Sequence, residues 1–298
     1  MSTTTTTQTQ PSSFGVAKPI TPPRGDTEAE LIFYSPPSDG SKPYNYVEPQ
    51  PEGSLQRNYG ENHQQVKIHD LRGHESEHGI NTSGFGVVSG VSESAEKEFV
   101  DDESIKSKYY PEVEKVLLEN VPGAERIFFF DHTVRRSQPG AKRAPVTRAH
   151  IDQTTKSARA RVYHHMGDEA EKLLNGRVRL INVWRPLNGP VVASPLAYAD
   201  SRTVTHEHIV PVEHRYPDRT GETAGVQYTK EGKWWYLSGM ENSERVLLQC
   251  YDSKDGARTP HTAFVDSRTQ DGWPGRESIE ACDEVRHEDD GHESVSFV

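Results

Sequence analysis

A histidine and an aspartate stand two positions apart in the stretch RAHIDQT, as His150 and Asp152. Residues i and i+2 of an extended backbone point to the same face, so both side chains could bind one metal ion. Spacing alone is weak support, because roughly one His-x-Asp arises by chance in a chain this rich in both residues. A second copy, His287-Glu288-Asp289, lies in the acidic C-terminal segment. The pair therefore needs further ligands from elsewhere in the chain.

Three downstream residues could complete such a site. His261, in TPHTAFVD, opens an apolar run, and Arg276 and Ser278, in GRESIE, are spaced to share one face of a strand. Two histidines and one carboxylate form a facial triad that leaves metal positions open for substrate and oxygen. An arginine fork binds a carboxylate through paired, charge-assisted hydrogen bonds. The order His-x-Asp, His, Arg-x-Ser therefore favours an iron(II) oxygenase that uses 2-oxoglutarate.

Two functions from other classes stay open at this point. The same three ligands could hold zinc in a hydrolase, and a β-rich chain could be a non-catalytic sandwich that binds a small molecule. A rival metal pair, His206 and His208, also has one-face spacing but lies in a polar connection. Oxygen-independent turnover would favour the hydrolase, and failure to bind iron would favour the binding protein.

The elements that must position these residues are mainly short strands. Turn residues separate apolar or alternating runs, a pattern typical of an antiparallel sandwich or barrel. The expected strands are 30–35, 64–71, 84–92, 126–137, 177–187, 196–204, 224–229, 233–239, 245–253, 262–267 and 277–285. Helical spacing appears at residues 94–121 and 158–176, and the second stretch ends at a glycine suited to a C-cap. We therefore expect a mainly β fold with flanking helices.

Composition limits the class of protein further. The 298 residues suit one large domain, and a mean hydropathy of -0.81 indicates segments outside the packed core. A net charge of -11 argues against nucleic-acid binding. No stretch approaches the ~20 apolar residues that span a bilayer. We expect a disordered tail at residues 1–28, a single domain over 29–285 and an acidic tail at 286–298.

The two cysteines indicate the cellular setting. Cys250 and Cys282 are far apart and form neither a disulfide framework nor a cysteine-rich metal site. A reducing, cytoplasmic setting is therefore expected. A homodimer stays open, because the sequence carries no clear signal for or against it.

Several long sequence segments resemble those of a known family. They are GRVRLINVWRPLNGPVVASPLAYADSRTV, YPDRTGETAGVQYTKEGKWWYLSGMENSERVLLQCYDS, TPHTAFVDS and GRESIEAC. In this order they are similar to the fungal and bacterial family typified by gibberellin desaturase, the AsaB-type hydroxylase/desaturases and the cephamycin 7-alpha-methoxylation protein. The resemblance extends over about residues 80–285. It departs from the family after ESIEA, where the sequence turns acidic instead of apolar.

The resemblance implies a fold, a set of cofactors and a reaction. The implied core is a double-stranded β-helix, similar to a jelly roll or cupin, and the implied cofactors are iron(II), 2-oxoglutarate and oxygen. The reaction would be hydroxylation, desaturation or oxidative cyclisation of a small natural-product intermediate. The implied site residues are His150, Asp152 and His261 for iron, Arg276 with Ser278 for 2-oxoglutarate, and Asn182 in INVWRP as a further cofactor contact.

Substrate-binding residues are harder to place from the sequence. The candidates are Arg136, Trp184, Tyr228 and Trp235. Each has a structural alternative, because a large aromatic residue more often fills the core and an arginine after a strand more often forms a salt bridge. The substrate itself does not follow from these residues.

Overall fold

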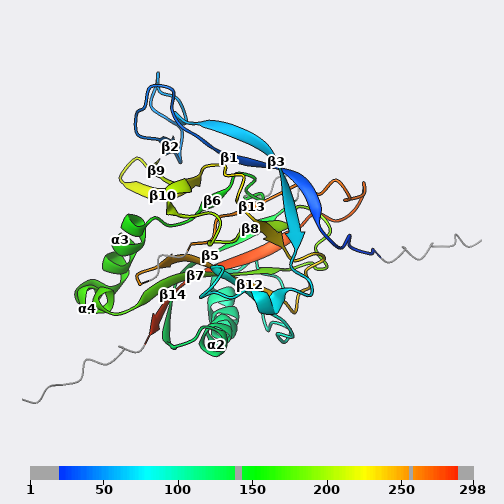
Figure 1. The fold of residues 1–298 in the computed structure, drawn as a ribbon. Coiled ribbons are helices and arrows are strands. Elements are labelled where there is room, and N and C mark those ends of the chain that lie inside the picture. The colour runs from blue at the N-terminus through cyan, green and yellow to red at the C-terminus, as the bar shows by residue number, and fades with distance from the viewer. Residues whose placement is uncertain (1–19, 138–142, 255–257, 288–298) are drawn as a thin grey trace, which may run out of the picture.

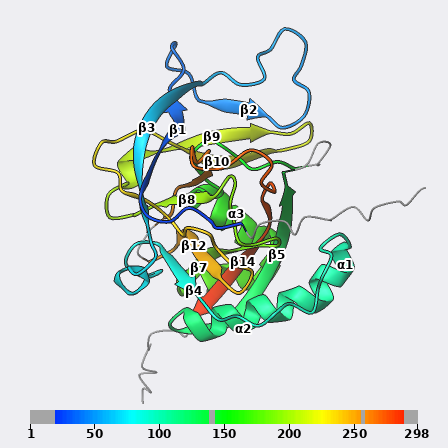
Figure 2. The same ribbon diagram turned by 90° about the vertical axis from the view of Figure 1, so that its right-hand side faces the viewer.

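The computed structural model describes residues 20–137, 143–254 and 258–287. In this part of the chain two β-sheets lie face to face, with helices at one side and beneath the smaller sheet (Figures 1 and 2). The larger sheet has the order β1 (Thr27–Ser35), β3 (Gly60–Asp70), β11 (Trp234–Tyr236), β8 (Leu196–Ala199), β13 (His261–Ala263), β6 (His150–Ile151), β10 (Thr220–Val226), β9 (Ile209–Arg215) and β2 (Tyr44–Tyr46). The smaller sheet has the order β4 (Phe85–Val88), β12 (Arg245–Asp252), β7 (Val178–Pro186), β14 (Glu277–His287) and β5 (Ala124–Arg136). The expectation of a mainly β fold is confirmed.

The smaller sheet is covered on both faces. Every residue of β7 and β12 is buried. Because side chains alternate between the faces of a strand, Ile181 and Val183 of β7 point outward and pack with the helix α2 (Tyr110–Asn120). Leu180 and Trp184 point the other way, toward the larger sheet. The even-numbered positions of β7 therefore face the space between the sheets.

The helices of the described chain form two stretches. The first helical stretch starts only at α1 (Asp102–Ser104), continues through a π-helical turn (Ile105–Tyr109) and ends in α2. The helix expected from residue 94 does not begin there, because the Glu96 carboxylate accepts the backbone N–H groups of Glu98 and Phe99 and holds this segment as a loop. The second stretch comprises α3 (Thr155–Met166), a 3-10 turn (Gly167–Glu169) and α4 (Ala170–Asn175). Two further 3-10 turns lie at Glu75–Glu77 and His206–His208.

Three short or polar strands are not predicted by the sequence pattern. β2 and β6 have three and two residues, too few for an alternation to be visible. β9 contains Pro211 and lacks a continuous apolar run, so the sequence pattern predicts a polar connection there. The ends of the domain also differ slightly: β1 begins at Thr27 and β14 continues to His287. None of the helices within the described ranges has the length and apolarity that a membrane crossing requires.

Candidate metal centre

His150, Asp152 and His261 converge at the junction of β6 and β13. One ligand atom from each lies within 4.8 Å of the others, and they form the one such group of three among the described residues. His261 is the direct cross-strand partner of His150. The Nε2 atoms of His150 and His261 lie 3.4 and 3.8 Å from the Asp152 carboxylate oxygens Oδ1 and Oδ2. Residues far apart in sequence thus place two imidazoles and one carboxylate around one point.

A capped helix fixes the position of Asp152. The residue lies between β6 and α3, whose N-cap is Thr154. The Thr154 hydroxyl accepts the Ser157 backbone N–H at 3.1 Å, and the Ser157 hydroxyl accepts the Thr154 backbone N–H at 2.9 Å. This reciprocal capping box holds the start of the helix. Asp152 is therefore confined to a short link between a paired strand and a fixed helix end.

Backbone carbonyls orient both imidazole rings. His150 Nδ1 lies 2.8 Å from the carbonyl oxygen of Arg148, and His261 Nδ1 lies 3.1 Å from that of Thr259. A carbonyl only accepts, so each Nδ1 carries a proton, and in the neutral ring each Nε2 has a lone pair. Both lone pairs are then available on the side of the Asp152 carboxylate. This is the arrangement by which metal-binding histidines are usually held.

The charges of the three groups also suit a cation. Burial, with the neighbouring His150, lowers the pKa of His261 to about 4, so its ring is neutral at physiological pH. Burial alone would raise the pKa of Asp152, but its hydrogen bonds with His150 and Asn182 and the proximity of His261 hold that pKa well below its usual range. Neutral imidazoles and an ionised carboxylate are the protonation states in which these groups bind metal. The donor set fits a divalent iron ion.

Asn182 links the triad to a further acidic residue. Its side-chain Nδ2 donates to Asp152 Oδ2 at 2.5 Å and to Glu280 Oε1 at 2.9 Å. Burial and the nearby Asp152 raise the pKa of Glu280 to about 7. Asn182 comes from β7 and Glu280 from β14, so the smaller sheet supplies the residues that support the carboxylate ligand.

A pocket connects the histidines to Arg276. His150, His261, Trp184, Arg276 and Glu280 are among the residues that line it. Arg276 is 3% exposed, and its Nη1 donates to the carbonyl oxygen of Ser194 at 2.8 Å, while its Nε has no partner in the described structure. Its guanidinium carbon lies 5.2 Å from the centre of the Trp184 ring. Burial lowers the pKa of Arg276 to about 10, which still leaves it charged at physiological pH.

Arg276 and Ser278 differ in their relation to this pocket. Ser278 is buried two residues further along β14, directly across from Arg135 of β5, and it is absent from the described residues that line the pocket. Asn182 contacts the Asp152 carboxylate rather than lining the pocket. Of the three cofactor-binding candidates, the arginine is therefore the one that lines the pocket together with the histidines.

The four substrate-binding candidates are dispersed. Trp184 lines the pocket. Arg136 points away from it, with an ion pair to Glu277 and a hydrogen bond to the carbonyl oxygen of Glu98 at 2.7 Å. The alternation along β5 brings Arg135 to the pocket, and a substrate contact by Arg136 stays a prediction.

The other two aromatic candidates lie elsewhere. Trp235 pairs with Tyr198, which pairs with His261, so it is two strand spacings, about 10 Å, from that histidine. Its ring contacts His78, with centroids 4.4 Å apart. Tyr228 is 37% exposed and packs on Phe33, with centroids 5.3 Å apart. The geometry brings neither ring to the triad.

Three polar residues near the triad were not predicted. Glu280 could have been found, because it continues the period-two row of Arg276 and Ser278 on β14. Arg135 could not be separated from its neighbour without knowing which face of β5 is inward. His214 of β9 is buried enough that its pKa is lowered, with the nearby His150 adding to the effect. It was missed because its strand was read as a polar connection.

The rival metal pairs differ from the triad in geometry. His206 and His208 lie in a 3-10 turn, in which residues i and i+2 point in different directions. Of the other copy, His287-Glu288-Asp289, the last two residues lie outside the described ranges.

Comparison with known proteins places the chain among oxidoreductases. The family profile described as "Oxidoreductase/YMDC permease-like domain" matches residues 31–283. The hydroxylase/desaturase poxK of Penicillium oxalicum is 34% identical over 87% of this chain and 90% of its own length. The Fe(II)/2-oxoglutarate-dependent dioxygenase nvfI of Aspergillus novofumigatus is 30% identical over 85% of this chain and 94% of its own length.

A solved structure agrees with these relatives. The iron and alpha-ketoglutarate-dependent endoperoxidase NvfI superposes with a TM-score of 0.80 over 89% of this chain and 99% of its own, at 28% sequence identity. The likeness extends over both sheets, which confirms the jelly-roll fold expected from the sequence.

Proposed function

We propose that this chain, which belongs to the family of Fe(II)- and 2-oxoglutarate-dependent hydroxylase/desaturases, holds iron(II) through His150, Asp152 and His261. One observation carries the assignment: His150 and His261 line one pocket together with Arg276, and the Asp152 carboxylate lies within ligand distance of both histidines. A facial triad can hold the metal, and a buried, incompletely paired guanidinium beside it can bind the far carboxylate of a dicarboxylate that coordinates the metal. The enzyme is an oxidoreductase that acts on a small molecule of natural-product biosynthesis.

The cofactors supply the chemistry and the protein supplies position. Iron(II) with 2-oxoglutarate and oxygen provides the oxidising power, and 2-oxoglutarate is decarboxylated to succinate. In our proposal Arg276 binds the far carboxylate of 2-oxoglutarate, where its unpartnered Nε and a neighbouring N–H can donate together. Trp184 covers this guanidinium and shields the bond from water.

The pocket must widen to admit the cofactor. Its volume of about 20 Å³ is near that of one water molecule. Arg276 is attached to the Ser194 carbonyl and to the Trp184 ring by non-covalent contacts alone, so these side chains can move. We infer that 2-oxoglutarate exchanges the Ser194 contact for its own carboxylate.

Support for iron over zinc comes from the relatives. Those reported above carry the names of a hydroxylase/desaturase, a dioxygenase and an endoperoxidase, all oxidative enzymes. A zinc hydrolase with the same ligands would turn over without oxygen. Anaerobic assays therefore separate the two: activity that persists without oxygen would contradict our proposal.

The central experiment measures metal binding and succinate together. The wild-type protein should bind one Mn(II), a redox-inert substitute for iron, and should release succinate when iron(II), 2-oxoglutarate and oxygen are added. His261→Ala should lose both, whereas His206→Ala, which changes an exposed histidine of the 3-10 turn, should lose neither. Circular dichroism checks that both variants are folded. Metal binding that survives in His261→Ala would contradict the ligand assignment.

Substrate contacts, location and assembly are finer proposals. Trp184 and Arg135 line the pocket and are the side chains we propose to meet the substrate. A cytoplasmic location and a homodimer stay predictions, which cell fractionation and sedimentation would test. Whether the carbon product is hydroxylated, desaturated or cyclised depends on the substrate that such assays identify.

A further inference from the structure

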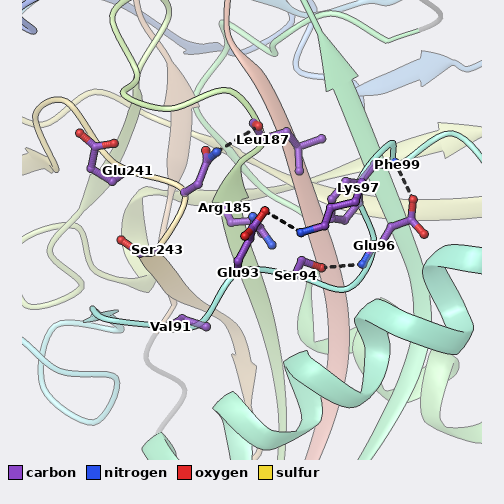
Figure 3. Close-up of a pocket in the computed structure, with 11 residues that line it drawn as sticks. Val91, Glu93, Ser94, Glu96, Lys97, Phe99, Arg185, Leu187, Glu241 and Ser243 are labelled. Carbon is purple, nitrogen blue, oxygen red and sulfur yellow. Dashed lines mark hydrogen bonds and ion pairs between the residues drawn. The ribbon is translucent and has the colours of Figure 1, made fainter.

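A second cavity lies on the outer face of the smaller sheet. It has a volume of about 380 Å³ and is enclosed by the loop of residues 91–99, the end of β7 and the turn at residues 241–243 (Figure 3). Arg185 lines this cavity, whereas its neighbour Trp184 lines the pocket of the metal centre. Adjacent residues of a strand point to opposite faces, so β7 separates the two spaces. The cavity is thus independent of the metal centre.

Two buried arginines lie side by side on this face of the sheet, and Arg185 is the one that lines the cavity. Arg185 is 4% exposed and Arg245 is 1% exposed. Val246 of β12 pairs with Trp184 of β7, and the same antiparallel register places Arg245 opposite Arg185. Like charges in directly opposed positions repel each other. Burial, together with the neighbouring Arg185, lowers the pKa of Arg245 to about 10.

Neither arginine has an acidic partner. Across the described residues, no carboxylate lies within ion-pair distance of either guanidinium. Arg185 Nε donates to the carbonyl oxygen of Pro186 at 3.2 Å, and its Nη1 has no partner. Arg245 Nη1 donates to the carbonyl oxygens of Asn242 and Glu244 at 2.7 and 2.9 Å. A buried charge of this kind is normally paired, so the arrangement lacks an anion.

The loop above Arg185 is built to keep the guanidinium in place. The Phe99 ring lies 5.4 Å from the Arg185 guanidinium carbon, and the Tyr109 ring lies 5.6 Å from it. Phe99 has a φ of 50°, in the left-handed region that non-glycine residues rarely adopt. The Glu96 carboxylate accepts the Phe99 backbone N–H at 2.9 Å and holds this conformation. Ring faces attract the cation but leave its N–H groups free to donate in the guanidinium plane.

We propose that this cavity binds a small monocarboxylate through Arg185. Arg185 lines the cavity and its buried Nη1 has no partner, and the hydroxyls of Ser94 and Ser243 are further donors among the lining residues. Three acidic residues also line the cavity, the exposed Glu93 and Glu241 and the buried Glu96, and Lys97 pairs with Glu93. This negative charge disfavours a multiply charged anion such as phosphate. Phe99 and Leu187 offer apolar contacts to the rest of the ligand.

Calorimetric titration of the full-length protein with benzoate tests the proposal, and inorganic phosphate serves as the comparison anion. Benzoate should bind the wild type, and Arg185→Met should weaken binding about tenfold or more, the effect of losing a charge-assisted hydrogen bond. Arg276→Met is the matched control, because it removes the guanidinium of the metal pocket. It should leave this binding in place.

Each outcome decides the question. Binding that is lost in Arg276→Met but kept in Arg185→Met would show that benzoate occupies the metal pocket, which overturns the proposal. Phosphate binding more tightly than benzoate would overturn the assignment to carboxylates. Absence of benzoate binding in the wild type would overturn it entirely. A thermal melt provides the check on folding: benzoate should raise the melting temperature of the wild type but not that of Arg185→Met.

Discussion

Asn182 is the residue whose replacement tests the design of the metal centre most directly. Its amide nitrogen donates one hydrogen bond to Asp152 and one to Glu280. Its side-chain oxygen accepts none in the described structure. Replacing Asn182 with leucine, which has a similar shape, therefore removes two donated bonds and no accepted one. Asp152 would keep its place in the chain but lose the group that orients its Oδ2 atom.

The size of the effect follows from the bond to Asp152. A hydrogen bond to a charged acceptor contributes about 1.5–3 kcal/mol. At about 1.4 kcal/mol for each factor of ten, its loss corresponds to roughly 10- to 100-fold weaker metal binding, as is usual for residues that orient metal ligands. The amide also separates two carboxylates, so its removal increases their repulsion in the metal-free protein.

Anaerobic calorimetry with Mn(II) measures this effect. Asn182→Leu should bind Mn(II) 10- to 100-fold more weakly than the wild type, by the reasoning above. Val183→Ala is the matched control, because it changes the next residue of β7, on the face that packs with α2. That variant should lose stability but retain its metal affinity. An Asn182→Leu protein that binds Mn(II) as the wild type does would refute the view that the amide positions Asp152.

Three further predictions concern the cofactor and the loops. Arg276→Met should weaken 2-oxoglutarate binding about 10-fold or more without loss of Mn(II) binding, as measured by calorimetry. The pKa of Glu280 is raised to about 7 by burial and by Asp152, so a negative charge appears in the pocket as the pH rises; 2-oxoglutarate should bind the wild type more weakly at pH 8 than at pH 6, and Glu280→Gln should remove this difference. The hydrogen bond from Ser104, followed by that from the Phe99 backbone, lowers the pKa of Glu96 from 4.5 to about 2. Its stabilising contribution is therefore complete above the unfolded value and is lost as the pH falls toward 2, and urea denaturation at several pH values should show a smaller loss for Glu96→Gln.

The sequence predicts the candidate metal ligands because the prediction depends on the spacing and order of residues along the chain. The i, i+2 spacing of His150 and Asp152 depends only on an extended backbone, and the order of His261 and Arg276 follows that of related enzymes. The strand pairing that brings the histidines together is not visible in the local pattern, since it depends on β6, a strand of two residues that pairs with β13. Pairing between strands so distant in sequence is set by the whole fold.

Residues that line a pocket are harder to predict than its metal ligands. Arg135 and Arg136 have the same chemistry, and only the register of β5 against β14 decides which one points inward. A shift of one residue would exchange them. Trp235 and Tyr228 are aromatic residues of strand-rich segments, and composition alone does not tell a pocket wall from a core residue.

The brevity of β6 gives the metal a mechanical role. Two residues form few backbone hydrogen bonds, and in the larger sheet β6 is paired with β13 at His150 and His261 alone. A bound ion would act as a cross-link between distant positions of the chain, closing a long loop whose entropy the unfolded protein would otherwise regain. Binding of the metal ion would then also complete the folding of the barrel. The folded enzyme would gain stability at the same step at which it becomes able to catalyse its reaction.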